Sequence, residues 1–507
     1  MPNAPTGRNA PTVLIAGAGP TGLTLACELA RTGVSFRLIE AAPDPQPGSR
    51  GKGIQPRTLE VFDDLGIVDR VLAHGRTAMP IRSTDADGQV TLTGVETVSV
   101  PPDIPYPDSL VTPEWRIEEA LRLRLAELGG SPEFDTVLDS FKQSDEGVSA
   151  VVIKNGEAET VTARWLVGCD GGHSVVRKQA GIAFEGETRE EVRMIVADVE
   201  VDGLDRSAWH MWRHDDGLLN LCPLPSTGVF QYQAAIAPGQ DPGLGLANLQ
   251  AILERRTGRT DIRLHEPAWS SLWRANIRLA DRYRKGHVFL AGDAAHIHSP
   301  AGGQGMNTGI QDSHNLGWKL AAVVNGASPA LLDSYEAERR PVAAGVLVLS
   351  NARLKETLEQ KGIPTQRDAR TSQLGIGYRD SALARDDRDD RDETAVLRAG
   401  DRAPDATKLT TVEGDCRLFD LTRGGHFTLL CFGNTPAVDA APSGLSTLRV
   451  VGRPTGPGDL ADTEGHLADA YGAAEHTLVL IRPDGYVALI SDAGDVSAVS
   501  DHLAAIS

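Results

Sequence analysis

A glycine-rich turn near the N-terminus constrains the fold more than any other feature of this sequence. The segment Gly17-Ala18-Gly19-Pro20-Thr21-Gly22 follows a short apolar run, Val13 to Ala16, which is typical of a buried parallel strand. A helix is expected from about Gly22 to Arg31, and a second strand from Phe36 to Ile39 ends at Glu40. The pattern predicts a βαβ unit, which is the context in which a G-x-G-x-x-G turn binds a dinucleotide.

The spacing within this turn explains why glycine is needed at each of its three positions. Gly17 permits the tight turn, Gly19 lets the backbone approach a pyrophosphate, and Gly22 allows a helix to pack closely on a strand. Free N–H groups at the helix N-terminus can bind phosphate oxygens. Glu40 lies 18 residues after Gly22, where a carboxylate accepts hydrogen bonds from a ribose diol. A purely structural turn is the competing interpretation, and the motif alone does not separate FAD from NAD.

A second glycine-rich segment follows the predicted strand Val288 to Ala291. The strand leads into Gly292-Asp293, a loop containing Gly302-Gly303-Gln304-Gly305-Met306-Asn307, and a helix from about Ile310 to Asn325. Exposed N–H groups and the positive end of the helix dipole would stabilise negative charge on a reduced flavin. A surface loop explains the glycines but not the order of strand, Gly-Asp, loop and helix.

A third segment, Cys169-Asp170-Gly171-Gly172-His173-Ser174, comes between a predicted strand ending at Val167 and a short helix containing Arg177. A turn that carries Asp, Gly and Ser before a helix is also ordinary capping chemistry. By itself this segment therefore leaves a structural and a functional interpretation open.

Composition excludes several classes of protein. With 507 residues, the chain is long enough for about three domains. The net charge of -19 argues against a nucleic-acid partner and weakly against an anionic membrane. Five cysteines without C-x-x-C spacing indicate free thiols in a reducing cytoplasm and no metal site. The first ten residues lack an apolar core, so no signal peptide is expected, and glycines interrupt the most apolar early stretch, which makes it a poor transmembrane helix.

The remaining pattern predicts further elements. We expect helices over Thr58–Val71 and Arg116–Leu128, and another that contains Ser334–Arg340 and ends before Pro341. Residues 183–275 alternate like strands, whereas the charge-dense segment 364–397 is predicted to be a linker or a solvated helix. The last 110 residues become globular again, with a strand at Phe427–Phe432 and a hairpin signal between Thr477–Ile481 and Tyr486–Leu489.

Taken together, these motifs resemble the group A flavoprotein monooxygenases, the para-hydroxybenzoate hydroxylase-like family, over about residues 1–345. They are most similar to bacterial polyketide and phenol hydroxylases that carry a C-terminal thioredoxin-like domain, which lacks C-x-x-C here and should be redox-inert. The implied fold is α/β, a Rossmann-like FAD-binding domain with an inserted sheet-rich substrate domain. The resemblance implies that residues 1–182 and 276–363, the latter with a connecting helix, form the FAD-binding domain, and that 183–275 form the substrate domain. Residues 78–112 belong either to the FAD-binding domain or to the substrate domain. Residues 364–397 would be a linker, and 398–507 the thioredoxin-like domain.

The resemblance also implies a cofactor set and its binding residues. FAD would bind non-covalently, NADPH or NADH would reduce it without a second nucleotide fold, and O2 would be the co-substrate. The cofactor-binding residues implied by the resemblance and the motifs are Gly17, Gly19, Pro20, Thr21, Gly22, Glu40, Arg50, Gln55, Arg116, Asp170, Gly292, Asp293, Pro300, Gly302, Gly303, Gly305, Met306 and Asn307.

The expected reaction is hydroxylation of a phenolic, polycyclic aromatic substrate by a flavin C4a-hydroperoxide. A general base would assist, but the sequence assigns none; packing or solvated roles are favoured for His210, Arg213, His214 and Tyr232. A Baeyer–Villiger or epoxidising enzyme and a non-catalytic flavin- or drug-binding protein remain alternatives. A simple dehydrogenase would not consume O2 in step with its substrate, and a halogenase is disfavoured because its G-W-x-W-x-I-P segment is missing. The only expected partner is a small aromatic molecule, and a homo-oligomer is left open.

Overall fold

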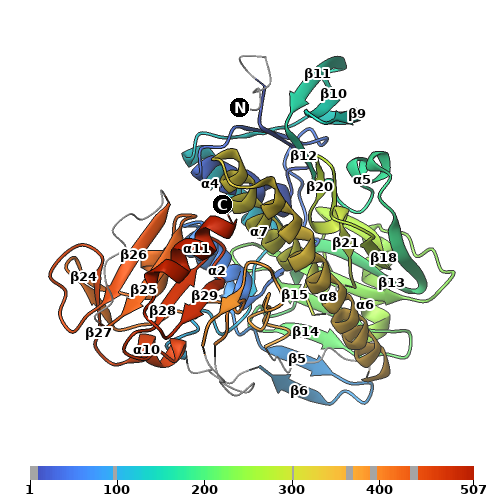
Figure 1. Cartoon of the computed structure of the whole chain (residues 1–507). Helices are drawn as coiled ribbons and strands as arrows, with labels where there is room; N and C mark the ends of the chain where they lie inside the picture. Colours follow the sequence, from blue (N-terminus) through green and yellow to red (C-terminus); the bar gives the residue numbers. More distant parts are fainter. Residues whose placement is uncertain are drawn as a thin grey trace.

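The computed structural model describes residues 10–94, 100–299, 302–360, 369–388, 397–433 and 444–506. The strands form three main sheets, and two long helices cross the centre of the molecule (Figure 1). Among the described residues, no helix is both long and apolar enough to cross a membrane.

The first sheet contains the predicted βαβ unit and has the strand order β19-β20-β12-β1-β2-β8. Its centre is β1, whose residues are all buried and which pairs in parallel with both β2 and β12. The bounds are β1 (Val13–Ala16), β2 (Phe36–Ile39), β8 (Pro132–Glu133), β12 (Trp165–Gly168), β19 (Arg284–Lys285) and β20 (Val288–Leu290). Strands far apart in the sequence therefore bring the three glycine-containing turns to the same edge of one sheet.

Helices pack closely around this sheet. The helix α1 (Pro20–Arg31) contacts both α4 (Glu114–Glu127) and α7 (Gly305–Val324). A Cβ atom at Gly317 of α7 would lie 2.4 Å from the Cβ of Glu28, so the two helices approach as closely as only glycine permits. The α1 helix begins at Pro20, earlier than expected, because proline suits the first helical position, where no N–H bond is needed.

The second sheet has the order β21-β18-β13-β16-β15-β14-β5-β6. Two of its strands, β5 and β6, come from residues 81–93, and β5 joins them to the sheet by pairing in parallel with β14 (Figure 1). The helix α6 (Leu246–Thr257) covers one face of this sheet with apolar side chains. The bounds are β5 (Ile81–Thr84), β6 (Val90–Thr93), β13 (Phe184–Asp202), β14 (Trp209–Trp212), β15 (Leu219–Pro223), β16 (Val229–Ile236), β18 (Trp269–Ala280) and β21 (His296–Ile297).

The C-terminal region forms the third sheet, ordered β22-β29-β28-β25-β26-β27-β23-β24. The predicted hairpin is present, because β28 and β29 pair antiparallel. The helix α11 (Val496–Ile506) packs beside it and ends near the C-terminus. The strand bounds are β22 (Arg385–Asp386), β23 (Leu409–Thr411), β24 (Gly414–Cys416), β25 (Phe427–Phe432), β26 (Leu445–Val450), β27 (Asp459–Asp462), β28 (Leu478–Ile481) and β29 (Val487–Ser491).

The single helix expected over Thr58–Val71 is two helices, α2 (Pro56–Asp64) and α3 (Val68–Ala73). They separate at Gly66, whose φ of +73° ends the first helix. Apolar spacing continued through the break because Leu65 and Ile67 are both buried, so periodicity alone did not reveal the turn.

Two other expectations about helix ends were wrong. The helix α7 begins at Gly305 and not near Ile310, and α8 (Asp333–Gln360) continues through Pro341. Proline removes one hydrogen bond inside a helix. The α8 helix nevertheless continues because side chains on both sides of the proline, such as Arg339 and Ala343, are buried against the rest of the chain.

The segment 364–397, expected to be a linker or a solvated helix, is described over 369–388 and at 397; residues 364–368 and 389–396 lie outside the described residues. The described part is neither helical nor fully solvated. Tyr378 and Leu383 are buried, and Arg385–Asp386 form the edge strand β22 beside β29. The charges are neutralised locally, since Arg388 pairs with Asp386 at 2.6 Å.

Candidate active site

The glycine turn after β1 combines two packed glycines with one that faces open space. A Cβ at Gly17, where φ is +102°, would lie 2.3 Å from the carbonyl oxygen of Cys169, and one at Gly22 would lie 1.9 Å from that of Gly17. A Cβ at Gly19 would meet no described protein atom within 4 Å. The protein itself therefore requires glycine at positions 17 and 22, whereas the space in front of Gly19, at the N-terminus of α1, is free for a ligand.

Glu40 is held beside this turn. One oxygen of its carboxylate accepts the N–H of Ala18 at 2.8 Å, and the other accepts the N–H of Ala42 at 2.9 Å. The half-buried carboxylate thus stands at the carboxyl end of β2 with its orientation fixed and lone pairs to spare. This is the position in which the sequence predicted a ribose contact.

The second turn mainly caps a helix. Asp170 accepts the N–H groups of Val175 and Val176, at 2.7 and 3.1 Å, at the start of α5 (Val175–Ala180). Its other oxygen, Oδ1, is buried and has no partner among the described residues. Arg177 joins this turn to the third one by donating to the carbonyl oxygen of Ala294 at 2.8 Å. This motif therefore has the capping role that the structural interpretation expected, and one carboxylate oxygen of Asp170 has no partner among the described residues.

The third turn follows β20 as a short 3-10 helix, Gly292–Ala294. At Gly292, where φ is +60°, a Cβ would lie 2.5 Å from the hydroxyl of Thr21, so this turn and α1 are in direct contact. The Asp293 side chain is exposed, yet protein atoms crowd it enough that desolvation raises its pKa, against the opposing effects of His296 and Arg50. An accessible but crowded carboxylate is suited to accepting hydrogen bonds from a bound polyol.

Buried charges that the sequence did not single out fix this turn in place. Asp312 of α7 accepts the N–H of Gly292 at 3.1 Å, contacts Nε2 of His296 at 2.6 Å and accepts Nε of Arg339 at 2.7 Å. Burial alone would raise the pKa of Asp312, but Arg339 and His296 outweigh it and hold the pKa below its ordinary value. In the sequence, Asp312 and Arg339 are charged residues within helical segments, and nothing there indicates that both face the core.

The loop before α7 is held by the side chains of Gln55 and Asn307. Gln55 donates through Nε2 to the carbonyl oxygens of Gly302 and Gly303, at 3.0 and 3.2 Å. Asn307 accepts the N–H of Gln55 at 2.8 Å and donates to the carbonyl oxygen of Gly53 at 2.9 Å. These two predicted site residues therefore position the loop backbone through their side-chain amides. Pro300 lies outside the described residues.

The segment that contains Arg50 reaches the same loop. The N–H of Gly51 donates to Glu114 at 2.5 Å, and a Cβ at Gly51 would lie 3.1 Å from the methyl group of Met306. Burial, with help from Glu118, raises the pKa of Glu114 to about 7. Arg50 is exposed near this carboxylate, whereas Arg116 pairs with Glu119 at 2.7 Å and lies over the Trp115 ring. Arg116 is thus turned to its own helix and not to the glycine loops.

Three of the side chains considered as bases, His210, Tyr232 and His214, are engaged with backbone groups of the protein. His210 contacts the carbonyl oxygen of Asp205 at 2.8 Å and stacks on Trp212. Tyr232 is fully buried and donates to the carbonyl oxygen of Leu249 in α6. His214 accepts the N–H of Asp216 at 3.0 Å, within its own loop.

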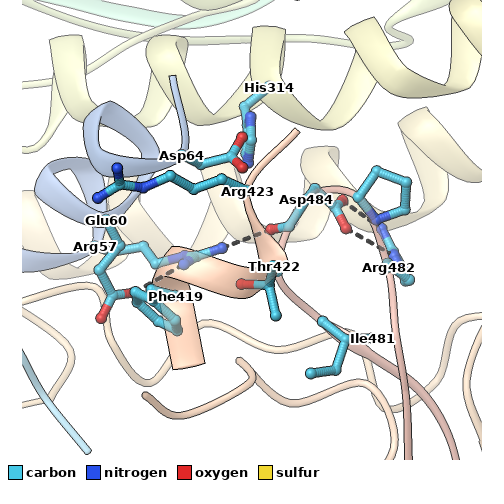
Figure 2. Close-up of a pocket in the computed structure, with 12 residues that line it drawn as sticks. Arg57, Glu60, Asp64, His314, Phe419, Thr422, Arg423, Ile481, Arg482 and Asp484 are labelled. Carbon is cyan, nitrogen blue, oxygen red and sulfur yellow. Dashed lines mark hydrogen bonds and ion pairs between the residues drawn. The ribbon is translucent and has the colours of Figure 1, made fainter. Parts of the chain in front are cut away.

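A separate pocket lies where the C-terminal region meets α2 and α7 (Figure 2). Its lining includes none of the residues predicted to bind the cofactor. Arg57 pairs with Glu60 at 2.8 Å, and Arg482 pairs with Asp484 at 2.6 Å. Each of these ion pairs lies within one region, and Arg57 of α2 donates across the contact to the carbonyl oxygen of Asp484 at 2.7 Å. This pocket therefore belongs to the interface between the two regions.

Glu28, Asp64 and His314 also meet beside this pocket, with one ligand atom from each within 4.8 Å of the others. Arg31 pairs with both carboxylates, each at 2.6 Å. The negative charge that would attract a cation is therefore already balanced by a guanidinium.

Comparison with known protein families shows which family this chain belongs to. Residues 10–350 match the family model of an FAD binding domain, and residues 397–506 match that of the aromatic-ring hydroxylase C-terminal domain. The chain belongs to the FAD-dependent aromatic-ring monooxygenases. The resemblance inferred from the motifs is confirmed, and so is the α/β fold.

Individual relatives of this monooxygenase extend over nearly its whole length. A flavin-dependent monooxygenase of Mycobacteroides abscessus is 44% identical over 95% of this chain and 98% of its own. Pentachlorophenol 4-monooxygenase of Sphingobium chlorophenolicum is 35% identical, over 96% of this chain and 94% of its own.

Two solved structures are similar to the monooxygenase throughout. The flavin-dependent monooxygenase PieE, in complex with FAD and substrate, has a TM-score of 0.86 at 27% identity and covers 98% of this chain and 99% of its own. Aklavinone-11 hydroxylase, in a ternary complex with FAD and aklavinone, has a TM-score of 0.84 at 27% identity, with 99% of each chain covered.

Proposed function

We propose that this monooxygenase hydroxylates a phenolic, polycyclic aromatic molecule, with NADPH or NADH as reductant and O2 as co-substrate. One observation carries the proposal. The open space in front of Gly19 lies beside the fixed carboxylate of Glu40, on the sheet edge where the other glycine-containing turns also end. The space and its donors fit a dinucleotide cofactor, which is what the family binds.

The residues of this chain divide the task of holding FAD. The turn at Gly19, with the first N–H groups of α1, would bind the pyrophosphate, and Glu40 would bind the adenosine ribose. Asp293, and the free oxygen of Asp170, are acceptors for the remaining hydroxyl groups. The backbone of 302–307 would lie along the flavin ring, because Gln55 and Asn307 hold it from behind.

When bound and reduced by the nicotinamide, FAD would activate O2, from which the transferred oxygen atom would come. The protein contributes position and exclusion of water. The names of two similar proteins support the substrate class, since one acts on pentachlorophenol and another was solved with aklavinone. Baeyer–Villiger oxidation and epoxidation use the same cofactor and are distinguished by the product.

The test follows NADPH oxidation, O2 uptake and H2O2 formation by purified holoenzyme, with and without a panel of polycyclic phenols. A hydroxylase should oxidise NADPH faster with one of the phenols while releasing little H2O2. A protein that binds FAD but responds to no aromatic molecule would contradict the proposed substrate class, and failure to bind FAD would contradict the site.

A further inference from the structure

The two faces of the second sheet differ in chemistry. Side chains on one face, including Trp212, Leu221 and Tyr232, form an apolar core with α6. Because side chains alternate along a strand, the residues next to these in the sequence lie on the opposite face of the sheet. That face presents polar and aromatic groups in register, since Asn220 stands opposite Gln233 on the neighbouring strand. Apart from its packing with α6, this sheet therefore has a second, polar surface.

Lys52 is brought to this polar face by the segment that contacts the cofactor loop. Its neighbour Gly51 approaches the methyl group of Met306, in the loop proposed to lie along the flavin. The Lys52 ammonium donates to the side-chain oxygen of Gln231 and lies 4.5 Å from the centre of the Trp209 ring. Lys52 thus joins the cofactor side of the molecule to the polar face of the sheet.

The ammonium of Lys52 donates to Gln231 and forms no ion pair with a carboxylate among the described residues. Asp198, on the same face, instead accepts the N–H of Ser49 at 2.7 Å. Burial lowers the pKa of Lys52, opposed by Cys222 and Asp198. A half-buried cation that has no carboxylate in direct contact costs free energy, which an anionic ligand would offset.

Other polar atoms on this face are also left without protein partners. Oδ1 of Asn220 and Nε1 of Trp209 are both buried and unpaired among the described residues. The Asn220 side chain is only 4% exposed. Buried polar groups normally have partners, so an acceptor at Asn220, a donor at Trp209 and the remaining N–H groups of Lys52 indicate a polar ligand.

We propose that Lys52 binds the ionised hydroxyl oxygen of an acidic phenolic substrate, with Trp209 donating to the same or a neighbouring oxygen and Asn220 accepting from a second hydroxyl. This inference rests on the proposed function and adds the group that selects an ionised phenol. An ionised phenol is also the more electron-rich ring, so the cation that holds it in place favours the reactive form of the substrate.

The experiment measures binding to the holoenzyme through the change in flavin absorbance. The probes are pentachlorophenol, which is ionised at neutral pH, and its methyl ether pentachloroanisole, which cannot ionise. Lys52→Met removes the charge at similar length, Lys52→Arg keeps it, and Lys142→Met, at an exposed position on β9 (Thr136–Ser144), is the matched control.

Lys52→Met should weaken pentachlorophenol binding on the order of tenfold to a hundredfold, as expected for a charge-assisted hydrogen bond. Pentachloroanisole binding should stay unchanged, Lys52→Arg should retain most of the affinity for the phenol, and Lys142→Met should alter neither probe. A purely structural lysine would weaken both probes together. Should Lys52→Met lose FAD, Trp209→Phe provides the second test, with a severalfold loss confined to the phenol.

Equal pentachlorophenol affinity in wild type and Lys52→Met would overturn the inference, as would a wild type that binds neither probe or prefers the ether. The proposed function fails by a different result, namely a wild type in which no phenol accelerates NADPH oxidation. A wild type and a Lys52→Met variant that hydroxylate phenols equally well would leave the function standing and remove Lys52 from it.

Discussion

Gly17 and Gly19 stand two positions apart in one turn, and the structure gives them different tasks. The first is required by the fold, since a side chain there would strike the carbonyl oxygen of Cys169. The second is not, because a Cβ there would point into open space. A sequence pattern lists both glycines alike, and only the packing around them separates folding from binding.

Substitution of these two glycines should therefore give opposite results. Gly17→Ala should destabilise the apoprotein by at least about 1–3 kcal/mol, from backbone strain alone. Gly19→Ala should leave the apoprotein's thermal midpoint unchanged and weaken FAD binding on the order of tenfold. Thermal unfolding of the apoproteins and titration of FAD fluorescence measure the two effects. Wild-type FAD affinity in Gly19→Ala would show that no phosphate approaches this backbone.

The raised pKa of Glu114 makes the stability of the apoprotein depend on pH. The folded chain holds this proton up to a pKa of about 7, whereas the ordinary value is 4.5. Between these values the folded state binds more protons than the unfolded state, so stability falls as the pH rises from about 4.5 to 7. Glu114→Gln should remove part of this fall and be more stable than wild type above pH 7.

Thermal midpoints of wild type and Glu114→Gln, measured across this range, check the prediction. Glu146→Gln, at an exposed position, is the control and should follow the wild-type curve. Parallel curves for wild type and Glu114→Gln would mean that this carboxyl group is ionised throughout.

The positions of the motif residues in the fold were easier to predict from the sequence than the contacts that their side chains make. Glu40 and the glycines stand where the motifs placed them, because a βαβ turn fixes its own geometry. Gln55 and Asn307 were predicted to touch the cofactor, yet their side chains hold backbone carbonyl oxygens. The pattern cannot distinguish these roles, since both need an amide at that position, and the cofactor contacts themselves stay predictions.

At the scale of elements, strands were predicted more accurately than helix ends. β1, β2 and β25 have the expected bounds, because short buried runs leave little choice. The start of α7 was misplaced because its glycines were taken for loop residues. Gly309 lies inside the helix, where a Cβ would meet the Thr21 hydroxyl at 2.6 Å. A glycine kept for close packing looks the same in a sequence as one kept for a turn.

Two helical glycines provide a matched test of this close packing. Gly317→Ala should destabilise the protein by about 1–3 kcal/mol, because the added methyl group overlaps Glu28 of α1. Gly345→Ala, in α8 with no described atom within 4 Å of the new Cβ, should instead stabilise it by about 0.4–1 kcal/mol. Denaturant midpoints measure both changes, and similar midpoints for the two variants would contradict the close approach of α1 and α7.

At the scale of the whole molecule, a buried charge network joins the C-terminal region to the helices around the cofactor site. Glu338 of α8 accepts hydrogen bonds from Arg482 at 2.7 and 2.9 Å and from Lys319 of α7 at 2.7 Å. Asp484 accepts the Asn315 side chain at 3.0 Å. The segment between these two regions, 364–397, is dense in charge, and its composition does not indicate that the C-terminal region packs against the helices α7 and α8.

Breaking this network should be costly. Glu338→Gln leaves Arg482 and Lys319 buried with one fewer negative partner, which should destabilise the protein by about 3–5 kcal/mol. Glu187→Gln, which breaks the exposed pair with Arg189, is the control and should cost at most about 1 kcal/mol. Equal denaturant midpoints in the two variants would mean that the network adds nothing to the attachment of the C-terminal region.

We propose that this monooxygenase transfers one atom of O2 to an aromatic ring. Turnover under 18O2 with NADPH and a phenol that accelerates NADPH oxidation tests this most directly, with the product analysed by mass spectrometry. Hydroxylation should give a product that carries one 18O atom as a new ring hydroxyl. Label found only in H2O2 and water, with the phenol unchanged, would contradict it.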